Sequence, residues 1–485
     1  MWYGLSSIAA RFINYLLTPY LTYTLANKSD YGRMGVIYSA IPLLNVLFTY
    51  GFETAYFRFS SKEENKKTIY STASLSLLIS TVFFTLILWM NQTALSKATG
   101  LADVPQILQV SIFIIAFDTL TRIPFARLRQ EGRPKMFAFV NISNILVNIF
   151  FTWFFIGYCP KHATGWVSSF YNPNTNAIVY VVIANLIASI FTLLLLSKEI
   201  LAIKLQFDTR LWKEMMVYSL PLIIAGMGGM INETFDRLML QWWLPGNEEY
   251  RLSQVGVYNA CYKLSILITL FIQAFRMGAE PFFFKQAESE NPQRVYARVM
   301  KFFVLTISVM FLVVTLYMPI WKRFISDKYW EGLAVVPILL LANMFLGIYY
   351  NLSVWYKLGH KTMAGAWITL AGAAITILIN YFFIPRFSYM ACAWATFFCY
   401  GSMMVFSFMW GQKEYRIPYA WRKLVAYMVI VVMLFFIHKG IVYFYSPSWF
   451  SLVTGSLLLA VFIWFILLVE KKEFQKLPVV GKYIR

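Results

Sequence analysis

The sequence predicts an all-α, polytopic membrane protein, and three observations lead to that fold class. Of its 485 residues, 59% are hydrophobic and only 13% are charged, and the mean hydropathy is +0.61. Apolar runs long enough to cross ~30 Å of hydrocarbon recur along the chain. A short motif also returns about 227 residues after its first occurrence, which indicates a duplicated membrane half.

The apolar runs give the expected elements in chain order. We expect ~14 transmembrane helices, arranged as two halves of six and a C-terminal pair. The runs lie near 1–26, 34–57, 69–91, 104–126, 136–158, 176–197, 214–240, 254–284, 300–320, 333–354, 362–384, 388–410, 421–440 and 449–469. Charged breaks follow the sixth and twelfth runs, so the predicted domains are an N-lobe over 1–200, a C-lobe over 201–411, and a C-terminal helix pair with a basic tail over 412–485.

The repeated motif is GFETAYFR at 51–58, which returns as GAEPFFFK at 278–285. Each copy has a glycine, a glutamate two residues later, then aromatic residues and a cation, and each closes an apolar run. Other glycines recur at the same or a slightly shorter offset, namely Gly132 as Gly359 and Gly32 as Gly256. We therefore expect the two six-helix lobes to be pseudo-symmetric.

The basic residues indicate the orientation of the chain. Most of the 42 Lys and Arg residues follow even-numbered runs or lie in the tail, so the positive-inside rule predicts that both termini are cytoplasmic. Because they lie in short loops, the net charge of +20 is a topology signal, and no nucleic-acid partner is expected. The first run contains Arg11 and precedes no small-residue cleavage site, so we expect a spanning helix there and not a secretory signal.

Four cations lie far from the ends of the apolar runs, namely Arg11 in the first run, Arg237 in the seventh, and Lys263 and Arg276 in the eighth. A cation in hydrocarbon costs a few kcal/mol or more, so these side chains are expected to face a water-filled interior. They are the candidate substrate-binding residues. The structural alternative is that Glu233 neutralises Arg237 and Glu280 neutralises Arg276, because each pair is four residues apart on a helix.

Five carboxylates are candidates for gating or for coupling to an ion, namely Glu53, Glu280, Glu233, Asp236 and Asp118. Glu53 and Glu280 occupy equivalent positions in the repeat, and pairing that stabilises the helix ends is the alternative role for both. Asp118 precedes Arg122 by four residues, so an interfacial salt bridge is expected there.

Helix-breaking residues fall in the first and seventh runs. The first run contains Pro19, and the seventh contains Pro221 followed by Gly228 and Gly229. Proline removes a backbone donor and clashes with the preceding turn, and glycine tolerates the resulting bend, so we expect hinges at these positions. Close helix packing is the alternative for Gly229, which forms a small-xxx-small pair with Ala225.

The sequence lacks several catalytic and cofactor signatures. It contains no GxxxxGK[ST] loop for nucleotides, no HExxH or Cys/His set for zinc, and no GxSxG elbow. We therefore predict no catalytic residue, no metal and no bound cofactor. The expected energy source is the membrane potential or an ion gradient of Na⁺ or H⁺.

Three stretches carry a family resemblance, namely ARFINYLLTPYLTYTLANKSDYGRMGVIYS, SLPLIIAGMGGMINETFDRLML and SQVGVYNACYKL. They resemble the polysaccharide-export flippases of the multidrug/oligosaccharidyl-lipid/polysaccharide (MOP) superfamily, with the Wzx-type O-antigen and capsule flippases as the nearest group. The resemblance covers essentially the whole chain. It implies two six-helix lobes around a V-shaped cavity formed mainly by helices 1, 2, 7 and 8, two added C-terminal helices, and alternating access.

The resemblance also implies a function. The substrate would be a polyprenyl-pyrophosphate-linked oligosaccharide such as an O-antigen, capsule or exopolysaccharide repeat unit, moved across the bacterial inner membrane without enzymatic chemistry. The implied partners are membrane lipids and the glycan polymerase or ligase machinery. Under this hypothesis the four cations offset the pyrophosphate charge in a low dielectric.

Three alternative functions remain open. A lipid II flippase would use similar physics. A multidrug antiporter of the same superfamily would share the architecture, although a basic interior suits cationic drugs poorly. A membrane glycan polymerase or ligase is the enzyme alternative, and the short external loops argue against it.

Overall fold

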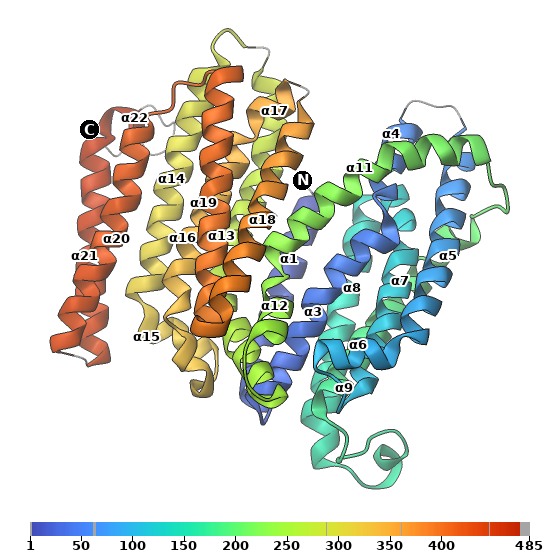
Figure 1. The fold of residues 1–485 in the computed structure, drawn as a ribbon. Helices are drawn as coiled ribbons and strands as arrows, with labels where there is room; N and C mark the ends of the chain where they lie inside the picture. The colour runs from blue at the N-terminus through green and yellow to red at the C-terminus, as the bar shows by residue number, and fades with distance from the viewer. Residues whose placement is uncertain (1, 62–64, 288, 360, 446, 476–485) are drawn as a thin grey trace. The chain divides into compact units, whose positions relative to one another are not determined.

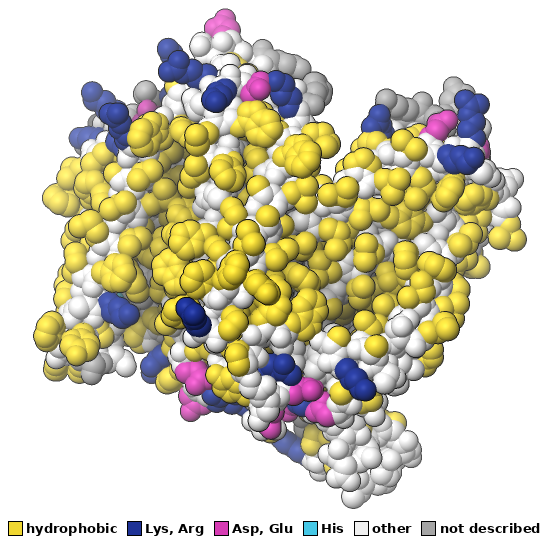
Figure 2. Space-filling model, viewed as in Figure 1, with side chains coloured by type: hydrophobic (Ala, Val, Ile, Leu, Met, Phe, Trp, Pro, Cys, Tyr) yellow, Lys and Arg dark blue, Asp and Glu magenta, His cyan; other side chains and the backbone are white. Residues whose placement is uncertain are grey.

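The computed structural model describes residues 2–61, 65–287, 289–359, 361–445 and 447–475, with side chains from residue 8 onward except that of residue 10. Helices make up 86% of the structure, and none of the described residues lies in a β-strand. Thirteen described helices are long and apolar enough to cross a membrane. On the face shown in Figure 2, hydrophobic side chains cover the helix middles, and charged side chains gather near the helix ends. The predicted all-α polytopic class is confirmed.

The first part of the chain, up to the eighth apolar run, contains twelve α-helices in the described residues (Figure 1). Their bounds are α1 Trp2–Tyr15, α2 Leu17–Thr24, α3 Lys28–Thr49, α4 Phe52–Ser60, α5 Lys66–Met90, α6 Gln92–Thr99, α7 Pro105–Gln130, α8 Pro134–Trp153, α9 Ala177–Leu195, α10 Ser197–Leu201, α11 Thr209–Glu233 and α12 Asp236–Trp243. A π-helical turn over Phe154–Tyr158 and short 3₁₀ turns lie between α8 and α9.

The second part begins with a helix of 39 residues, α13 Glu248–Gln286. The helices that follow are α14 Pro292–Leu316, α15 Met318–Trp321, α16 Val335–Leu352, α17 Val354–Leu358, α18 Thr362–Phe387, α19 Tyr389–Glu414, α20 Trp421–Phe444, α21 Ser448–Val469 and α22 Lys471–Phe474. Residues 476–485 of the predicted basic tail lie outside the described residues.

The chain divides into two compact units. Unit 1 contains residues 1–263 and 366–399, and unit 2 contains residues 264–365 and 400–485. The division falls inside α13, α18 and α19, so it does not coincide with the predicted lobe boundaries at 200 and 411. The predicted lobes therefore stay a prediction.

The first apolar run forms two helices instead of the single spanning helix that we expected. α1 ends at Tyr15, Leu16 forms a turn, and α2 begins at Leu17. Pro19 accounts for the break, because its ring clashes with the carbonyl four residues earlier, which belongs to Tyr15.

Local sequence signals set many of the other helix boundaries. Pro105, Pro134 and Pro292 occupy the first turns of α7, α8 and α14, where the missing N–H costs nothing. The Asp208 side chain accepts the backbone N–H groups of Arg210 and Leu211 at 2.9 and 3.0 Å and so caps α11.

Within unit 1, α3 and α13 touch backbone to backbone at Gly32 and Gly256. A Cβ atom placed on Gly32 would lie 1.8 Å from the Leu252 carbonyl oxygen, and one placed on Gly256 would lie 2.1 Å from the Lys28 carbonyl oxygen. The contact is reciprocal. Gly32 faces Gly256 and Leu252, and Gly256 faces Gly32 and Lys28. Leu252 and Lys28 each stand four residues before the glycine of their own helix. This is the geometry of a two-fold symmetric interface, and the two glycines are the pair that recurs in the sequence.

The two copies of the repeated motif differ in backbone conformation. In the first copy, α3 ends at Thr49, and Tyr50 and Gly51 adopt left-handed φ angles of 34° and 74° before α4 begins. Gly278, the equivalent of Gly51, lies inside the continuous helix α13. The left-handed turn lets α4 pack against α11, where Tyr50 and neighbouring residues form a buried cluster.

Within unit 2, the C-terminal helices α20 and α21 pack against α14. At one end the Glu470 carboxylate, only 2% exposed, receives the Lys301 and Lys423 ammonium groups at 3.0 and 2.6 Å and the Tyr427 hydroxyl at 2.5 Å. Burial opposes ionisation of this carboxyl, but the three donors outweigh burial and lower the pKa of Glu470. Nearer the opposite end, a Cβ on Gly455 would lie 3.1 Å from the Leu316 carbonyl oxygen, so α21 approaches α14 closely there too.

Candidate functional site: charged groups inside the spans

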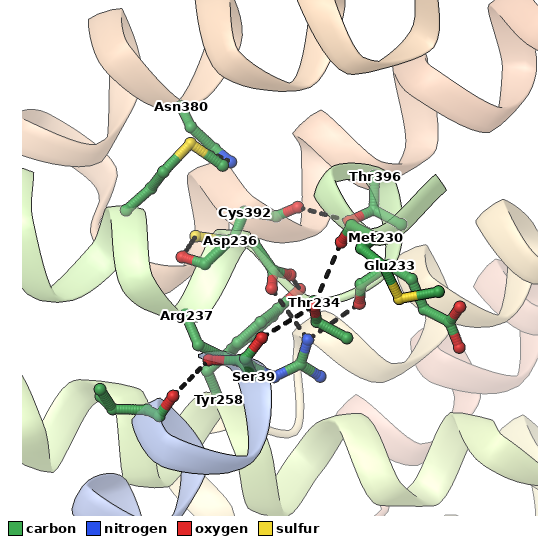
Figure 3. A network of polar contacts seen from close by, with 12 residues as sticks. Ser39, Met230, Glu233, Thr234, Asp236, Arg237, Tyr258, Asn380, Cys392 and Thr396 are labelled. Atoms are coloured by element: carbon green, nitrogen blue, oxygen red, sulfur yellow. Dashed lines mark hydrogen bonds and ion pairs between the residues drawn. The ribbon is translucent and has the colours of Figure 1, made fainter. Parts of the chain in front are cut away.

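The seventh apolar run breaks near its C-terminal end, just before Asp236 and Arg237. α11 ends at Glu233, a turn at Thr234 and Phe235 follows, and α12 begins at Asp236. Arg237 is 6% exposed, and its Nη1 donates to the Asp236 carboxylate at 2.8 Å and to the Glu233 backbone carbonyl at 3.0 Å (Figure 3). The guanidinium is therefore neutralised by its neighbour in the chain.

The structural alternative, in which the Glu233 carboxylate neutralises Arg237, is wrong. Figure 3 shows the Glu233 carboxylate pointing away from the guanidinium, and only its backbone oxygen is bonded to Arg237. The physical reason is the turn at Thr234, because residues four apart share a face only on an unbroken helix. Glu233 is exposed and forms no ion pair with any described residue.

Polar and aromatic groups of α13 and α19 contact the Asp236–Arg237 pair. The Tyr258 hydroxyl donates to the second carboxylate oxygen of Asp236 at 2.6 Å, and the Cys392 thiol lies 3.7 Å from the Asp236 carbonyl (Figure 3). The Arg237 guanidinium stacks on the Tyr262 ring at 4.3 Å from its centroid. Residues from α12, α13 and α19 of unit 1 thus hold the pair, which marks it as a structural element of this unit.

Two of the four candidate cations have no carboxylate partner among the described residues, and both belong to unit 1. Arg11 is an exposed residue of α1 and forms no ion pair there. Lys263 is partly buried in α13, forms no ion pair, and experiences the positive charge of Arg237. Both lie in apolar runs of the sequence, where a cation without a counter-charge is costly in hydrocarbon, so water or a bound anion would stabilise these two side chains.

The fourth cation, Arg276, lies in a charged cluster of unit 2. Its Nη2 is 3.5 Å from the Glu280 carboxylate, so the pairing considered as the structural alternative is present. Lys357 contacts the same carboxylate at 2.6 Å, and the Arg276 guanidinium lies 3.9 Å from the centroid of the Tyr350 ring. The sequence interpretation missed Lys357, because it assigned that residue to a loop, although it lies two residues before the recurring Gly359.

The other carboxylate candidates are also engaged. Glu53 forms an ion pair with Arg129, whose guanidinium lies 4.9 Å from the centroid of the Phe57 ring. Asp118 accepts a hydrogen bond from the Ser189 hydroxyl at 2.8 Å and forms no ion pair with Arg122, so the expected salt bridge is wrong. Asp118 faces the packed interface of α7 with α9, where a neutral donor already satisfies it.

The predicted hinge residues lie near the breaks but not at them. α11 continues through Pro221, Gly228 and Gly229 and breaks five residues after Gly229. Gly228 packs against Leu370 and Thr369, whereas nothing lies within 4 Å of a Cβ placed on Gly229. Among the described residues, none packs closely on Gly229, and the hinge role of all these residues stays a prediction.

The described residues contain no group of three or more His, Cys, Asp or Glu side chains placed to hold a metal ion. None of the four cysteines, all of which the structure describes, forms a disulfide, and all four are buried.

Comparison with known proteins gives the family. Residues 1–286 match the family described as polysaccharide biosynthesis protein. The chain belongs to this family. No curated protein matches the sequence.

Solved structures give the fold of this family member. The chain is similar to lipid II flippase MurJ in an inward closed conformation, with a TM-score of 0.69 and 12% identity over 97% of this chain and 99% of that chain. It is also similar to an inward-facing multidrug resistance MATE transporter of the MOP superfamily, with a TM-score of 0.64 and 13% identity over 86% of this chain and 95% of that chain. The chain is also similar to a MATE protein in the straight conformation, with a TM-score of 0.59 and 14% identity over 88% of this chain and 95% of that chain. The protein is a multi-pass membrane protein with the fold of MOP transporters and flippases.

Proposed function

We propose that the protein flips a polyprenyl-pyrophosphate-linked oligosaccharide from the cytoplasmic to the outer leaflet of a bacterial inner membrane. Membership of a polysaccharide biosynthesis family and the fold shared with a lipid-linked-substrate flippase support this proposal. The observation that carries it is the presence of two cations in apolar runs, Arg11 in α1 and Lys263 in α13, that form no ion pair with any described residue. A pyrophosphate is an anion that such groups bind well in a low dielectric.

The assignment of roles to the four cations follows from their partners. Arg11 and Lys263 are the residues that we propose contact the substrate, since no carboxylate competes for them. Arg237 is already neutralised by Asp236, so we propose that it stabilises the broken helix instead. Transport would proceed by alternating access, with both termini in the cytoplasm and the lipid tail of the substrate in the bilayer.

Coupling to an ion gradient requires a carboxylate that can bind H⁺ or Na⁺. Among the five candidates, Glu53, Glu280 and Asp236 are held by cations, and Asp118 accepts a hydroxyl hydrogen bond. Glu233 is exposed at the helix break and has no ion-pair partner in the described part of the chain. We therefore propose Glu233 as the coupling carboxylate.

The test uses cells that lack this protein and carry Arg11→Gln or Lys263→Gln variants. We expect both variants to accumulate lipid-linked oligosaccharide facing the cytoplasm while their amount in the membrane stays normal. Lys439→Gln is the matched control, because Lys439 is an exposed span residue without an ion pair near the end of α20. Full export by both test variants would contradict the proposal, and drug sensitivity without accumulation would assign the protein to multidrug transport.

A further inference from the structure

A row of aromatic rings runs along α8 and continues past the C-terminal end of that helix. Its members, which stand four residues apart, are Phe150, Phe154, Tyr158 and His162. Each ring stacks on the next, with planes 12°, 12° and 14° apart and centroids 6.3, 5.6 and 4.2 Å apart. The π-helical turn over Phe154–Tyr158 carries the row out of the helix. This aromatic ladder therefore extends from a spanning helix into the loop that follows it.

The loop between α8 and α9, which Figure 1 shows beyond the end of α9, folds back onto the ladder. The rings of Trp166 and Phe170 lie 6.3 and 6.1 Å from the ring of Phe154, with planes 28° and 20° apart, and 5.4 Å from each other. Both rings stay open on their outer side, because Trp166 is 63% exposed and Phe170 is 44% exposed. An aromatic cluster left open to water forgoes the free energy of burial, so it indicates a surface that a partner covers.

Internal contacts fix the other side of this loop to unit 1. Val167, next to Trp166 in the chain, is 1% exposed. The Asn172 backbone N–H donates to the Tyr180 hydroxyl at 2.7 Å, and that hydroxyl donates to the Asn172 carbonyl at 3.2 Å. The Asn176 side chain donates to the Asp30 carboxylate at 2.7 Å. The loop therefore presents its two exposed rings in a defined position.

The helix on which the ladder begins indicates what covers the rings. After its first turn, the exposed side chains of α8 are all apolar, namely Phe139, Leu146, Phe150 and Trp153. Their spacing of seven, four and three residues places them on one face of the helix. An exposed apolar face on a spanning helix is the surface that contacts lipid. Because Phe150 belongs both to this face and to the ladder, the lipid-facing surface continues into the loop.

The charge of the loop fits the same occupant. Residues 159–176 contain no Asp or Glu, and Lys161 and His162 are the only residues there that can carry a positive charge. A nearly neutral surface of aromatic rings among small polar residues matches the boundary between lipid headgroups and acyl chains, where Trp and Tyr are enriched. A glycan would also stack on exposed rings, but it would not account for the continuity with the lipid-facing side of α8.

We propose that the loop of residues 159–176 is an interfacial anchor, in which Trp166 and Phe170 enter the headgroup boundary of the leaflet at this end of α8. The ladder holds both rings close to the end of the spanning helix, and the loop lies against the bilayer instead of standing free in solvent. The predicted topology makes this the outer leaflet, because the loop follows the fifth apolar run. The proposal requires only a membrane-spanning chain, so it stands or falls independently of the proposed function.

The test places a spin label on the loop of the full-length protein, in nanodiscs that hold one copy each. Ser169 stands three residues after Trp166 in the 3₁₀ turn Gly165–Ser169, so the two side chains lie on the same side of that turn. We expect a label on Ser169→Cys to be reached by oxygen, which dissolves in the bilayer, more readily than by a nickel chelate, which stays in water. Asn174→Cys, an exposed position in the polar part of the same loop, is the matched control and should show the opposite preference. The unsubstituted protein, whose four cysteines are buried, gives the labelling background.

Removing the rings tests their part in the anchor. Trp166→Ser combined with Phe170→Ser should reverse the oxygen preference of the label on Ser169→Cys, whereas Trp166→Tyr, which keeps an amphipathic ring, should retain it. An unchanged melting temperature of the unlabelled double variant shows that the loss is local. An oxygen preference that survives in the double variant would overturn the anchor. If the double variant does not fold, Trp166→Ser alone decides the question by the same two outcomes.

Other occupants of the surface give different results. A label on Ser169→Cys that the nickel chelate reaches more readily than oxygen, with both rings present, overturns the anchor. If maltoheptaose then protects that label from the chelate, the loop is a glycan-binding surface instead. Since each nanodisc holds one copy, an oxygen preference cannot arise from contact with a second chain.

Discussion

The crossing of α3 and α13 gives the sharpest prediction, because Gly32→Ala and Gly256→Ala place a carbon atom against a backbone carbonyl. The added Cβ would lie 1.8 Å from the Leu252 oxygen in the first variant and 2.1 Å from the Lys28 oxygen in the second. A carbon-to-carbonyl contact needs about 3.3 Å, so the helices must separate by roughly 1.2 to 1.5 Å. Neither obstacle can rotate away, since both belong to the main chain.

We expect each substitution to destabilise the folded protein by about 2 kcal/mol, because overpacking at its usual upper end costs about 3 kcal/mol and alanine gains ~1 kcal/mol over glycine in a helix. The readout is the fraction of purified protein that stays folded after heating. Gly440→Ala in α20 is the control, because no atom of the described part of the chain lies within 4 Å of its added Cβ, and it should be neutral or slightly stabilising.

The double variant decides whether the contact is reciprocal. Once one alanine has moved the helices apart, the second should cost little, so the two effects should fall well short of additivity in a double-mutant cycle. Gly32→Ala as stable as Gly440→Ala, or full additivity of the two crossing variants, would refute the reasoning.

Three further predictions concern buried charges. Asp236→Asn leaves the Arg237 guanidinium buried without a counter-charge and should lower the free energy of unfolding by about 3–5 kcal/mol. The loss is measured as the decrease of folded protein in detergent, and the control Glu233→Gln should leave stability unchanged. The folded-state pKa of Glu470 lies below its ordinary value of 4.5, so the ionised carboxylate stabilises the folded protein above that pH. This stabilisation is lost as the pH falls from about 4.5 through the lower folded-state pKa, and the melting temperature should fall with it. Glu470→Gln should flatten this part of the plot of melting temperature against pH. Arg122→Ala should leave stability unchanged, whereas Asp118→Leu should destabilise the protein by about 1–3 kcal/mol because the Ser189 hydroxyl loses its hydrogen-bond acceptor. A large loss of stability in Arg122→Ala would instead indicate a salt bridge between Asp118 and Arg122.

Properties that depend on local composition could be predicted from the sequence. Apolar runs predict spans because the bilayer imposes a length, and the recurring glycines predict the duplicated half. The Arg276–Glu280 pair was predictable because α13 is unbroken between them, so residues four apart share a face.

The remaining site features depend on tertiary structure. Arg237 pairs with Asp236 and not with Glu233 because a turn interrupts the helix between Glu233 and Asp236. No pattern in the seventh run predicted a break at Thr234. The partner of Asp118 is Ser189, which α9 brings from 71 residues away. Arg129 and Lys357 entered the interpretation only as loop cations, since their pairing with the repeated glutamates is a contact between helices.

The fastening of the last two spans has a practical consequence. α20 and α21 are tied to α14 through Glu470 at one end and by the close approach of Gly455 near the other, so they form a stiff extension of that helix. A fluorophore attached to the outer surface of α21 would follow any displacement of α14 faithfully. Such a probe would allow the working cycle to be recorded without touching any of the ionisable groups under study.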